Sequence, residues 1–408
     1  MNSLIDKGKQ LTKQDVIDKV AALEIREYGV YHDYLIDIWN NLLDRHDSEK
    51  LPIQLVTALN NNDTKKVLLD IVRKTPHKVL EGMQIVAYVL GAKDLFLYLP
   101  ENEKQLLMEL ELIAKDYGIQ IVSSGFVDRR KYEVCAFHHI ETMAVLAEAF
   151  TDHYETGVLA AVARNGIVSD LQKIPYGTKV SDMISTKAED MKGFEINSKI
   201  YNSSALDMII DKEFAMGNGV ITIINNTDCM INEAKKHLET AHIIGCGKCT
   251  FCREGILQLY GLVKDITKSK GKNEFLTLMK EIGEALPSAS LCSIGKTGAD
   301  FLLDSLTLYS SEYEDHIKRK KCAATVCDSF VPIYIDPELC IGCEECTSVC
   351  PEDCIEGKTG YIHMIDELDC TKCGKCIEVC ESGAIKKASG RTPKLPERLT
   401  KCGKFRKH

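Results

Sequence analysis

The stretch Cys340-Ile-Gly-Cys343-Glu-Glu-Cys346-Thr-Ser-Val-Cys350-Pro351 determines how the C-terminal part of this chain is organised. Its spacing, C-x2-C-x2-C-x3-C, returns in Cys370-Thr-Lys-Cys373-Gly-Lys-Cys376-Ile-Glu-Val-Cys380. In each run the two-residue gaps allow three thiolates to converge on one centre while the intervening amides face its sulfur atoms. The fourth cysteine of each run lies too far along the chain to join the same centre, so it is expected to cross to the other one.

This doubled pattern is that of a two-cluster ferredoxin. Zinc sites usually use two C-x2-C pairs rather than triplets with a crossed fourth ligand, so iron–sulfur clusters are favoured over zinc or disulfides. Crossed ligation assigns the eight thiolates to two [4Fe-4S] clusters, the first held by Cys340, Cys343, Cys346 and Cys380 and the second by Cys370, Cys373, Cys376 and Cys350.

Length, composition and charge exclude several classes of protein. The chain has 408 residues, enough for two to four domains, and 45% of them are apolar, so a sizeable core can form. The net charge of −9 gives no basis for nucleic-acid binding. The 18 cysteines occur in metal-ligand spacings, which favours the reducing cytoplasm of an anaerobe over secretion. No segment has the length of a membrane span, and the first residues lack the apolar run of a signal peptide.

A third triplet, Cys246-Gly-Lys-Cys249-Thr-Phe-Cys252, lies in the glycine-rich segment 245–255. Cys292 is the natural fourth ligand, because it lies in the loop after a later predicted helix and can return to the start of the helix that contains Cys252. Glycines allow close backbone approach, and amides at a helix N-terminus offset the negative charge of a cluster. These residues predict a third [4Fe-4S] cluster, with zinc held by four thiolates as the competing interpretation.

Apolar periodicity and turn residues predict the remaining elements. Residues 1–75 are expected to be helical, and residues 76–152 alternate helices with short strands in an α/β unit. Between 156 and 225, short strands predict a small α+β module in which Thr178 or Ser181 caps a helix. A four-helix bundle is expected from five helical segments with short connections, at 232–239, 253–268, 273–286, 299–308 and 312–318.

The segment 245–255 resembles the cluster-binding signature of the flavin- and NADH-binding subunit of respiratory complex I. This subunit type also occurs in NAD-linked formate dehydrogenases and in multimeric iron–iron hydrogenases. The stretch His139-Ile-Glu141-Thr142 is similar to a helix start of that family. Segments 291–297 and 312–317 resemble the β-subunit branch of electron-bifurcating iron–iron hydrogenases, which also carries a two-cluster ferredoxin domain.

The resemblance implies an α+β multidomain chain. Its expected parts are a degenerate α/β domain of the FMN/NADH type (1–152), a β-grasp domain of the SLBB type (153–228), a four-helix bundle with one [4Fe-4S] cluster (229–321), a ferredoxin domain with two [4Fe-4S] clusters (322–390) and a basic C-terminal tail (391–408). The tail is expected to be solvated, or to dock on an acidic partner subunit.

The loops with which that family binds flavin and nicotinamide are degenerate here. The family binds FMN with a glycine-rich loop, because backbone amides can then cradle the phosphate. The corresponding stretch, Ile25–Tyr34, keeps one glycine and holds two acids and three tyrosines. Ala58–Thr64 replaces the loop that receives NADH, and the glycine-rich segment before Glu141 is missing. We therefore expect no FMN or NADH site and no catalytic residues, the alternative being a flavin bound by a rearranged loop.

A histidine and two cysteines between the bundle and the ferredoxin unit have the spacing of zinc ligands. His316, Cys322 and Cys327 are the three, and Cys229 is one conceivable fourth ligand. The competing interpretation is two buried free thiols and a surface histidine, and the sequence leaves both open. The other cysteines, Cys135, Cys354 and Cys402, are expected to be free thiols.

Three functions are consistent with these features. The first is an electron-transfer subunit with three [4Fe-4S] clusters and no flavin. As the resemblance implies, its partners would be an iron–iron hydrogenase-type catalytic subunit, a [2Fe-2S] thioredoxin-like subunit and a separate flavin and NAD(P)H subunit. The second is an FMN-containing NADH dehydrogenase (diaphorase) subunit of the same kind of complex. The third is a scaffold whose clusters are redox-inert.

Overall fold

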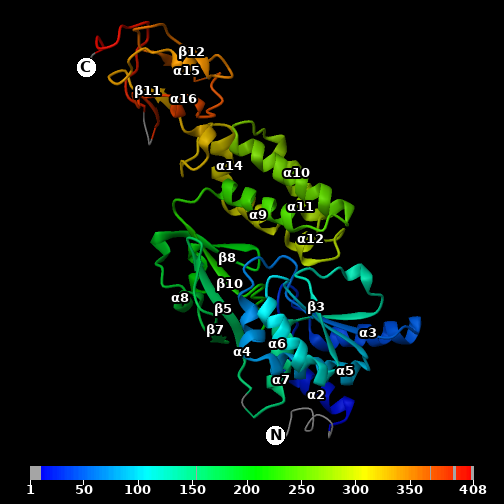
Figure 1. Cartoon of the computed structure of the whole chain (residues 1–408). Helices are drawn as coiled ribbons and strands as arrows, with labels where there is room; N and C mark the ends of the chain where they lie inside the picture. Colours follow the sequence, from blue (N-terminus) through cyan, green and yellow to red (C-terminus); the bar gives the residue numbers. More distant parts are fainter. Residues whose placement is uncertain (1–10, 153, 368, 389–391, 406–408) are drawn as a thin grey trace. The chain divides into compact units, whose positions relative to one another are not determined.

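The structure is a computed structural model, and it describes residues 11–152, 154–367, 369–388 and 392–405 (Figure 1). The chain divides into two compact units. The first comprises residues 1–226, 240–256 and 283–304, and the second comprises residues 227–239, 257–282 and 305–408. Each unit is described by itself. No helix of the described residues is long and apolar enough to cross a membrane.

A parallel four-stranded sheet forms the centre of the first unit. Its strands are β1 (Gln54–Ala58), β2 (Asp94–Leu99), β3 (Ile119–Ser123) and β4 (Cys135–His139), in the order β3-β2-β1-β4. Helices α2 (Lys13–Ala22) and α3 (Leu35–Glu49) precede β1. Helices α4 (Asp70–Lys74) and α5 (Pro76–Leu90) connect β1 to β2, α6 (Lys104–Ala114) connects β2 to β3, and α7 (Ile140–Ala149) follows β4. The chain passes from β1 through β2 to β3 on one side and returns to place β4 on the other side of β1. The strand order therefore reverses between β1 and β4, where open parallel sheets bind ligands.

Helices α5 and α7 pack directly against each other. Helix α5 begins with Pro76 at its first turn and ends at Gly91, whose φ of 69° is left-handed, as expected for a helix start and a helix C-cap. Near its middle, Gly82 has no room for a side chain, because a Cβ atom there would lie 1.9 Å from the carbonyl oxygen of Met143 in α7. This close contact holds α7, and with it the end of β4, against the sheet.

Strand β1 shows that one sequence-based expectation was wrong. Residues 1–75 were expected to be helical, but Gln54–Ala58 form a central strand with partners on both sides. The three consecutive residues Leu55, Val56 and Thr57 are all buried, so the strand lacks the alternating pattern that marks a half-exposed strand. A short buried run of this kind cannot be distinguished from part of a helix by periodicity.

The second sheet of the first unit lies in residues 157–225. Its strands are β5 (Gly157–Arg164), β6 (Ile167–Val168), β7 (Gln172–Pro175), β8 (Met191–Ile196), β9 (Lys199–Asn202) and β10 (Val220–Asn225), in the order β6-β5-β10-β8-β9 with β7 paired to β5. Strands β7, β8 and β9 were not predicted. The predicted helix after Pro175 shrinks to the single turn α8 (Val180–Met183), and its N-cap is Lys179 rather than Thr178 or Ser181.

The helical segments predicted between residues 229 and 321 are all present. They are α9 (Met230–Ile244), α10 (Thr250–Thr267), α11 (Glu274–Ala285), α13 (Asp300–Leu308) and α14 (Ser310–Ile317), with a further short helix α12 (Ser293–Thr297) after Cys292. Helices α10 and α13 contain residues of both units. Their assembly into a four-helix bundle stays a prediction.

The C-terminal part of the second unit contains two short antiparallel pairs. Strand β11 (Ile333–Ile335) pairs with β14 (Ile385–Lys387), and β12 (Ile355–Glu356) pairs with β13 (Met364–Ile365). Two single-turn helices, α15 (Glu345–Ser348) and α16 (Lys375–Glu378), contain the third cysteine of each triplet, Cys346 and Cys376. Part of the basic tail is also ordered by hydrogen bonds, because the amide of Ile362 donates to Thr400 and Tyr361 forms a bridge with Lys401. A tail that is solvated throughout is therefore ruled out.

Candidate functional site

Four cysteines of the first unit surround one cavity of about 180 Å³. Cys246 and Cys249 lie in the loop between α9 and α10, Cys252 lies in the first turn of α10, and Cys292 precedes α12. The cavity is several times larger than the roughly 30 Å³ that a water molecule occupies in the liquid. Burial raises the pKa of the Cys252 thiol to about 11, and the neighbouring Cys292, Cys249 and Cys246 add to the effect. Four converging thiols around an apolar cavity fit a [4Fe-4S] cluster.

Glycines make the approach of these four thiols possible. At Gly295 a Cβ atom would lie 2.2 Å from Ser290 Oγ and 3.1 Å from Cys252 Sγ, so a larger residue would push the Cys292 loop away from α10. Gly247 has a φ of +70°, which favours glycine, and its carbonyl accepts a hydrogen bond of 2.8 Å from Arg253. The Lys248 ammonium donates to the Asp128 carboxylate at 2.5 Å, which ties the cysteine loop to the loop before β4.

The surroundings of Cys350 agree with the crossed ligation predicted for the ferredoxin part, which itself stays a prediction. Cys350 lines the same narrow cavity as Cys370, Cys373 and Cys376, which belong to the other cysteine run. Burial raises the pKa of Cys376 to about 11, with further contributions that include Cys370, Cys373 and Cys350. The amide of Lys372 donates to Cys370 Sγ at 3.4 Å, as expected of amides that face cluster sulfurs. These thiols fit the second [4Fe-4S] cluster.

The thiols predicted for the other ferredoxin cluster are placed less completely. Burial raises the pKa of Cys346 to about 11, and the next contributions come from Cys340 and Cys343, so this triplet is together. Cys380 Sγ lies 3.5 Å from Ser382 Oγ, and its ligand role stays a prediction. Cys354, expected to be a free thiol, is buried with its Sγ 3.4 Å from Cys350 Sγ.

The four residues named for zinc in the sequence lie together in the second unit. The ligand atoms of Cys229, His316, Cys322 and Cys327 are all within 4.8 Å of one another, and all four residues are buried. Cys229 Sγ lies 3.4 Å from His316 Nε2 and 3.7 Å from Cys327 Sγ. Zn–S bonds of about 2.3 Å and Zn–N bonds of about 2.0 Å, arranged as a tetrahedron, give edges of about 3.5–3.8 Å. The separations of 3.4 and 3.7 Å match these edges, and all four ligand atoms lie within 4.8 Å of one another, so the donors are close enough together to hold a zinc ion.

Two further contacts prepare these groups for a metal. His316 Nδ1 donates a hydrogen bond of 2.8 Å to the Glu312 carbonyl oxygen, which orients the ring so that Nε2 faces the thiol of Cys229. Hydrogen bonding from Cys229, and next from Cys327, holds the pKa of the Cys322 thiol far below its usual range. The thiolate is the form that binds metals.

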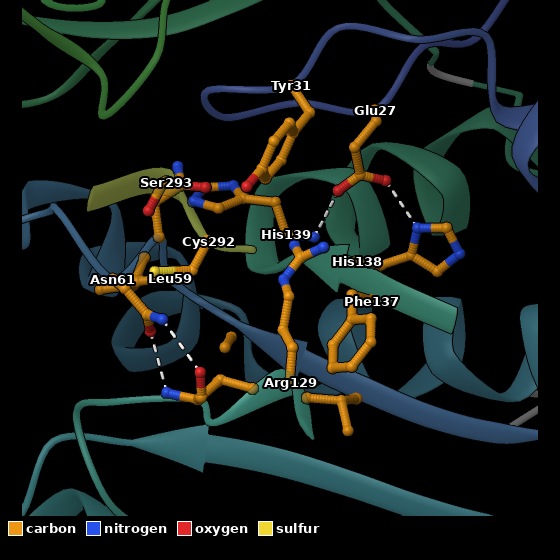
Figure 2. A pocket seen from close by; sticks show the side chains of 14 residues that line it. Glu27, Tyr31, Leu59, Asn61, Arg129, Phe137, His138, His139, Cys292 and Ser293 are labelled. Atoms are coloured by element: carbon orange, nitrogen blue, oxygen red, sulfur yellow. Dashed lines mark hydrogen bonds and ion pairs between the residues drawn. The ribbon is translucent and has the colours of Figure 1, made fainter. Parts of the chain in front are cut away.

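A second pocket of the first unit lies where the strand order reverses, at the carboxyl ends of β1 and β4. Its volume is about 40 Å³, and Figure 2 shows Tyr31, Arg129 and His139 around it, with Cys292 in its wall. Pockets for drug-sized ligands measure about 300–1,000 Å³, so this space is much smaller than a pocket of that kind.

A buried carboxylate organises the side of this pocket next to β4. Glu27 accepts hydrogen bonds from His138 Nδ1 at 2.6 Å, from the His139 amide at 2.5 Å and from Thr142 Oγ1 at 3.0 Å. His138 Nε2 in turn accepts from the Trp39 indole at 3.2 Å, which fixes the proton of His138 on Nδ1. Because all three donors converge on one carboxylate, the loop that contains Glu27 is fastened to the start of α7.

Burial also sets the protonation of the groups beside this network. It lowers the pKa of His139 to about 4, so the imidazole is neutral at neutral pH. It raises the pKa of Tyr31, so the phenol keeps its proton. It raises the pKa of Glu141 to about 7, an effect that the hydrogen bond from the Leu159 amide opposes.

The pKa of Glu141 predicts a pH dependence of stability. The carboxyl ionises near pH 4.5 in the unfolded chain but near pH 7 in the folded protein, so folding binds a proton between these values. The contribution of Glu141 to stability is therefore greatest below about pH 4.5 and declines as the pH rises to about 7, by up to about 3 kcal/mol. Glu141→Gln keeps the acceptor for Leu159 and should raise the unfolding temperature relative to wild type at pH 8 but not at pH 5. An equal difference at both pH values would contradict this assignment.

Comparison with known proteins identifies the two iron–sulfur regions. Residues 232–316 match the family model of the NADH-ubiquinone oxidoreductase-F iron-sulfur binding region, and residues 332–381 match that of the 4Fe-4S dicluster domain. The chain therefore carries the iron–sulfur region of the NADH-ubiquinone oxidoreductase F family, followed by a dicluster domain. These matches agree with the resemblance inferred from residues 245–255 and from the doubled cysteine run.

Curated relatives cover part of the chain. The NADP-reducing hydrogenase subunit HndC of Solidesulfovibrio fructosivorans is 38% identical over 164 residues, which cover 39% of this chain and 34% of HndC. The F subunit of the NADH-quinone oxidoreductase of Streptomyces coelicolor is 28% identical over 132 residues, which cover 31% of this chain and 29% of that protein. The match thus spans about a third of the length of these relatives.

The fold resembles that of a solved hydrogenase. A structure of NAD+-reducing [NiFe]-hydrogenase in the air-oxidized state aligns with a TM-score of 0.63 and 16% identity, over 78% of this chain and 65% of the hydrogenase chain. At this identity the likeness concerns the fold alone. The expectation of a mixed α/β multidomain chain with iron–sulfur domains is confirmed.

Two features of these sites were missed in the sequence. The pocket between β1 and β4 was overlooked because β1 was taken for helix. Cys229 was named only as a conceivable zinc ligand, because nothing in its local sequence links it to a partner 87 residues away. A cysteine directly before a predicted helix was the available signal.

Proposed function

We propose that this chain is an iron–sulfur electron-transfer subunit of a multisubunit oxidoreductase and that it binds no flavin itself. The observation that carries this proposal is the combination of three sets of clustered thiols with a pocket of only about 40 Å³ at the sheet position where a nucleotide would bind. Electrons would pass between the cluster of Cys246, Cys249, Cys252 and Cys292 and the two ferredoxin clusters. Hydrogen bonds to the sulfurs and solvent exposure would set their potentials.

The stretch that replaces the FMN loop supports the absence of flavin. In Ile25–Tyr34 the chain turns back on itself, with a hydrogen bond of 2.9 Å from the Glu27 amide to the Asp33 carbonyl. Gly29 is enclosed, because a Cβ atom there would lie 2.7 Å from Asn60 Nδ2. The Tyr28 amide donates to Thr142 rather than facing a cavity. These contacts occupy the amides of Glu27 and Tyr28 and enclose Gly29, which supports the proposal that this loop does not cradle a phosphate.

The loop that replaces the NADH-receiving loop is also occupied by internal hydrogen bonds. Asn61 exchanges two hydrogen bonds with the backbone of Val127, at 2.8 and 2.9 Å. Asn62 donates to Ser293 at 3.2 Å and to Thr297 at 3.0 Å, so this loop is fastened to α12. A nicotinamide nucleotide would have to displace these contacts.

We assign a structural zinc ion to Cys229, His316, Cys322 and Cys327. The support is that four buried donors from separate parts of the chain lie within 4.8 Å of one another. Such an ion would join the start of α9, the end of α14 and the segment that leads to β11. A closed site with four protein ligands has no open position for a substrate, so its role is structural.

The partners that fit this function are other oxidoreductase subunits. A chain without a nucleotide site needs a separate flavin subunit that carries out NAD(P)H chemistry, and it needs a catalytic subunit that uses the electrons. We propose that the catalytic subunit is of the [FeFe]-hydrogenase type, accompanied by a [2Fe-2S] thioredoxin-like subunit, in a cytoplasmic complex in which electron bifurcation takes place. The name of HndC, an NADP-reducing hydrogenase subunit, supports a hydrogenase complex.

An FMN-containing NADH dehydrogenase subunit is the second candidate. The observation that favours it is the retained parallel sheet, with its pocket still located where the strand order reverses. A flavin would require the Glu27 loop to open and the three hydrogen bonds to its carboxylate to break.

Elemental and flavin analysis of the anaerobically purified complex distinguishes these candidates. We expect about twelve iron and about twelve sulfide per chain from three cubanes, together with one zinc and no FMN assigned to this chain. Partial reduction by dithionite should give electron paramagnetic resonance signals that disappear when the partner oxidises the clusters. Stoichiometric FMN in the isolated chain, with dye reduction by NADH, would establish the second candidate instead. Clusters that no partner oxidises would indicate a scaffold.

A further inference from the structure

The pocket between β1 and β4 contains two buried polar atoms without partners. His139 Nε2 and Tyr31 Oη are both shielded from solvent and have no hydrogen-bond partner among the described residues. The His139 side chain belongs to a residue that is only 4% exposed. A buried polar atom without a partner destabilises the fold, so these two atoms indicate a missing ligand.

The hydrogen-bond pattern identifies both atoms as donors. His139 Nδ1 accepts a hydrogen bond of 3.3 Å from the Glu141 amide, so it carries no proton. In a neutral imidazole the proton then lies on Nε2, which can donate into the pocket. The Tyr31 hydroxyl is a donor as well when no other donor faces it. A ligand that satisfies both atoms must therefore offer acceptors.

Arg129 supplies a third donor and the positive charge. Its guanidinium lies over the Tyr31 ring at 5.0 Å from the ring centroid and over the Phe137 ring at 4.5 Å. Within the described part of the chain it makes these two ring contacts and joins no salt bridge. Stacking on two rings orients the guanidinium while leaving its N–H groups available at the edge, as in sites that bind planar anions.

The Glu27 carboxylate, which lines the same pocket, does not accept hydrogen bonds from the unpartnered donors of His139 and Tyr31. Glu27 is the only acidic residue among the described residues that line the pocket, and its two oxygens accept three hydrogen bonds from β4 and α7. The unpartnered donors therefore remain for a ligand rather than for a side chain.

We propose that this pocket binds a small monovalent oxyanion of the size of formate. Its oxygens would accept from His139 Nε2, Tyr31 Oη and the Arg129 guanidinium. A cavity of about 40 Å³ admits such a molecule or a few waters, since one water needs about 10–15 Å³ on this measure, and it excludes larger carboxylates and phosphates. The proposal does not depend on the electron-transfer function, because it concerns a pocket whose lining is given by the structure.

The position of the pocket links the anion to the neighbouring cluster. Cys292 lines both this pocket and the cavity of the four thiols. A negative charge beside a cluster ligand disfavours the addition of an electron to that cluster. Bound anion should therefore shift the reduction of this cluster to lower potential without changing its iron content.

Formate binding to the anaerobically purified full chain tests the proposal. Line broadening of ¹³C-formate in nuclear magnetic resonance should show saturable binding that is weakened about five- to tenfold in Tyr31→Phe, which removes one donor without changing shape. Arg129→Met should abolish binding. Tyr132→Phe is the matched control, because the Tyr132 hydroxyl bonds Tyr98 outside this pocket, and it should bind as wild type. Iron analysis verifies that each variant is intact.

Two outcomes would overturn the proposal. One is an absence of saturable binding up to about 100 mM formate, which would mean that only water occupies the pocket. The other is binding that Tyr31→Phe leaves unchanged, which would place the anion elsewhere. A potentiometric titration followed by electron paramagnetic resonance adds a separate readout, in which formate lowers the potential of the cluster next to Cys292 in wild type and in Tyr132→Phe but not in Arg129→Met.

Discussion

Replacement of Cys292 by alanine is expected to remove one of the three clusters from this chain. Cys292 lines the cavity opposite Cys246, Cys249 and Cys252, and it is the one ligand of that proposed set outside the triplet. With three thiolates the cubane is open to loss of an iron and then to disassembly. Iron content should fall from about twelve to about eight per chain, and the complex should lose electron flow through this chain. Iron and sulfide analysis, with electron paramagnetic resonance of the dithionite-reduced protein, measures both effects.

Cys135→Ala is the matched control for this experiment. Cys135 is a buried thiol of β4 in the same unit, and burial raises its pKa to about 12, so it does not supply a thiolate. This variant should keep about twelve iron. If Cys292→Ala also keeps its full iron content, the fourth ligand is another group and the proposed set is wrong. If both variants lose iron, the loss reports instability of the fold rather than ligation.

Most of the predictions about the clusters came from the spacing of the cysteines in the sequence. Residues two apart in a C-x2-C run can reach one metal centre whatever the rest of the chain does, so local sequence was sufficient for the triplets. Crossed ligation follows from chain length alone, and the structure places Cys350 beside Cys370, Cys373 and Cys376 as expected. The helical segments between residues 229 and 321 were also predictable, because their apolar residues recur at helical spacing.

Features that depend on contacts between residues far apart in the chain were harder to predict from the sequence. Strand β1 is buried on both faces, so it lacks the alternation from which a strand can be recognised. The pocket that depends on β1 and β4 was therefore not predicted. The expectation that Ile25–Tyr34 binds no flavin came from its loss of glycines and stays a prediction. The acid Glu27, which would repel a phosphate, instead accepts three hydrogen bonds that close the loop.

Cys229 illustrates the same limit for the proposed zinc site. His316 and the Cys322–Cys327 pair lie close in sequence and could be grouped by spacing, but the fourth residue precedes α9, α10, α11 and α13 in the chain. Only the folded chain brings its Sγ to 3.4 Å from His316 Nε2. The interpretation as two free thiols and a surface histidine is weakened by one measurement, because His316 is 1% exposed.

Removal of this proposed ion is expected to have the largest effect on stability. Zinc binding contributes about 10–16 kcal/mol of apparent free energy in small zinc domains, and the Cys229→Ala variant leaves three donors that hold the ion much more weakly. Zinc should fall from one per chain to a small fraction, and the unfolding midpoint of the second unit should drop by at least the equivalent of about 3 kcal/mol. Zinc analysis by mass spectrometry and limited proteolysis between residues 317 and 332 measure these two effects.

A cysteine outside the group provides the comparison that separates zinc ligation from thiol loss in general. Cys402 belongs to the same unit but not to the group of four, so Cys402→Ala should keep both its zinc and its resistance to proteolysis. Wild-type protein that contains no zinc after growth in zinc-replete medium would contradict the assignment, as would Cys229→Ala that retains the ion. X-ray absorption at the zinc edge decides the ligand set directly, because three sulfurs at about 2.3 Å and one nitrogen at about 2.0 Å are expected. A spectrum with four sulfurs would mean that His316 is not a ligand and that the edge-on contact of its ring with Phe330, 4.9 Å between centroids, is its main interaction.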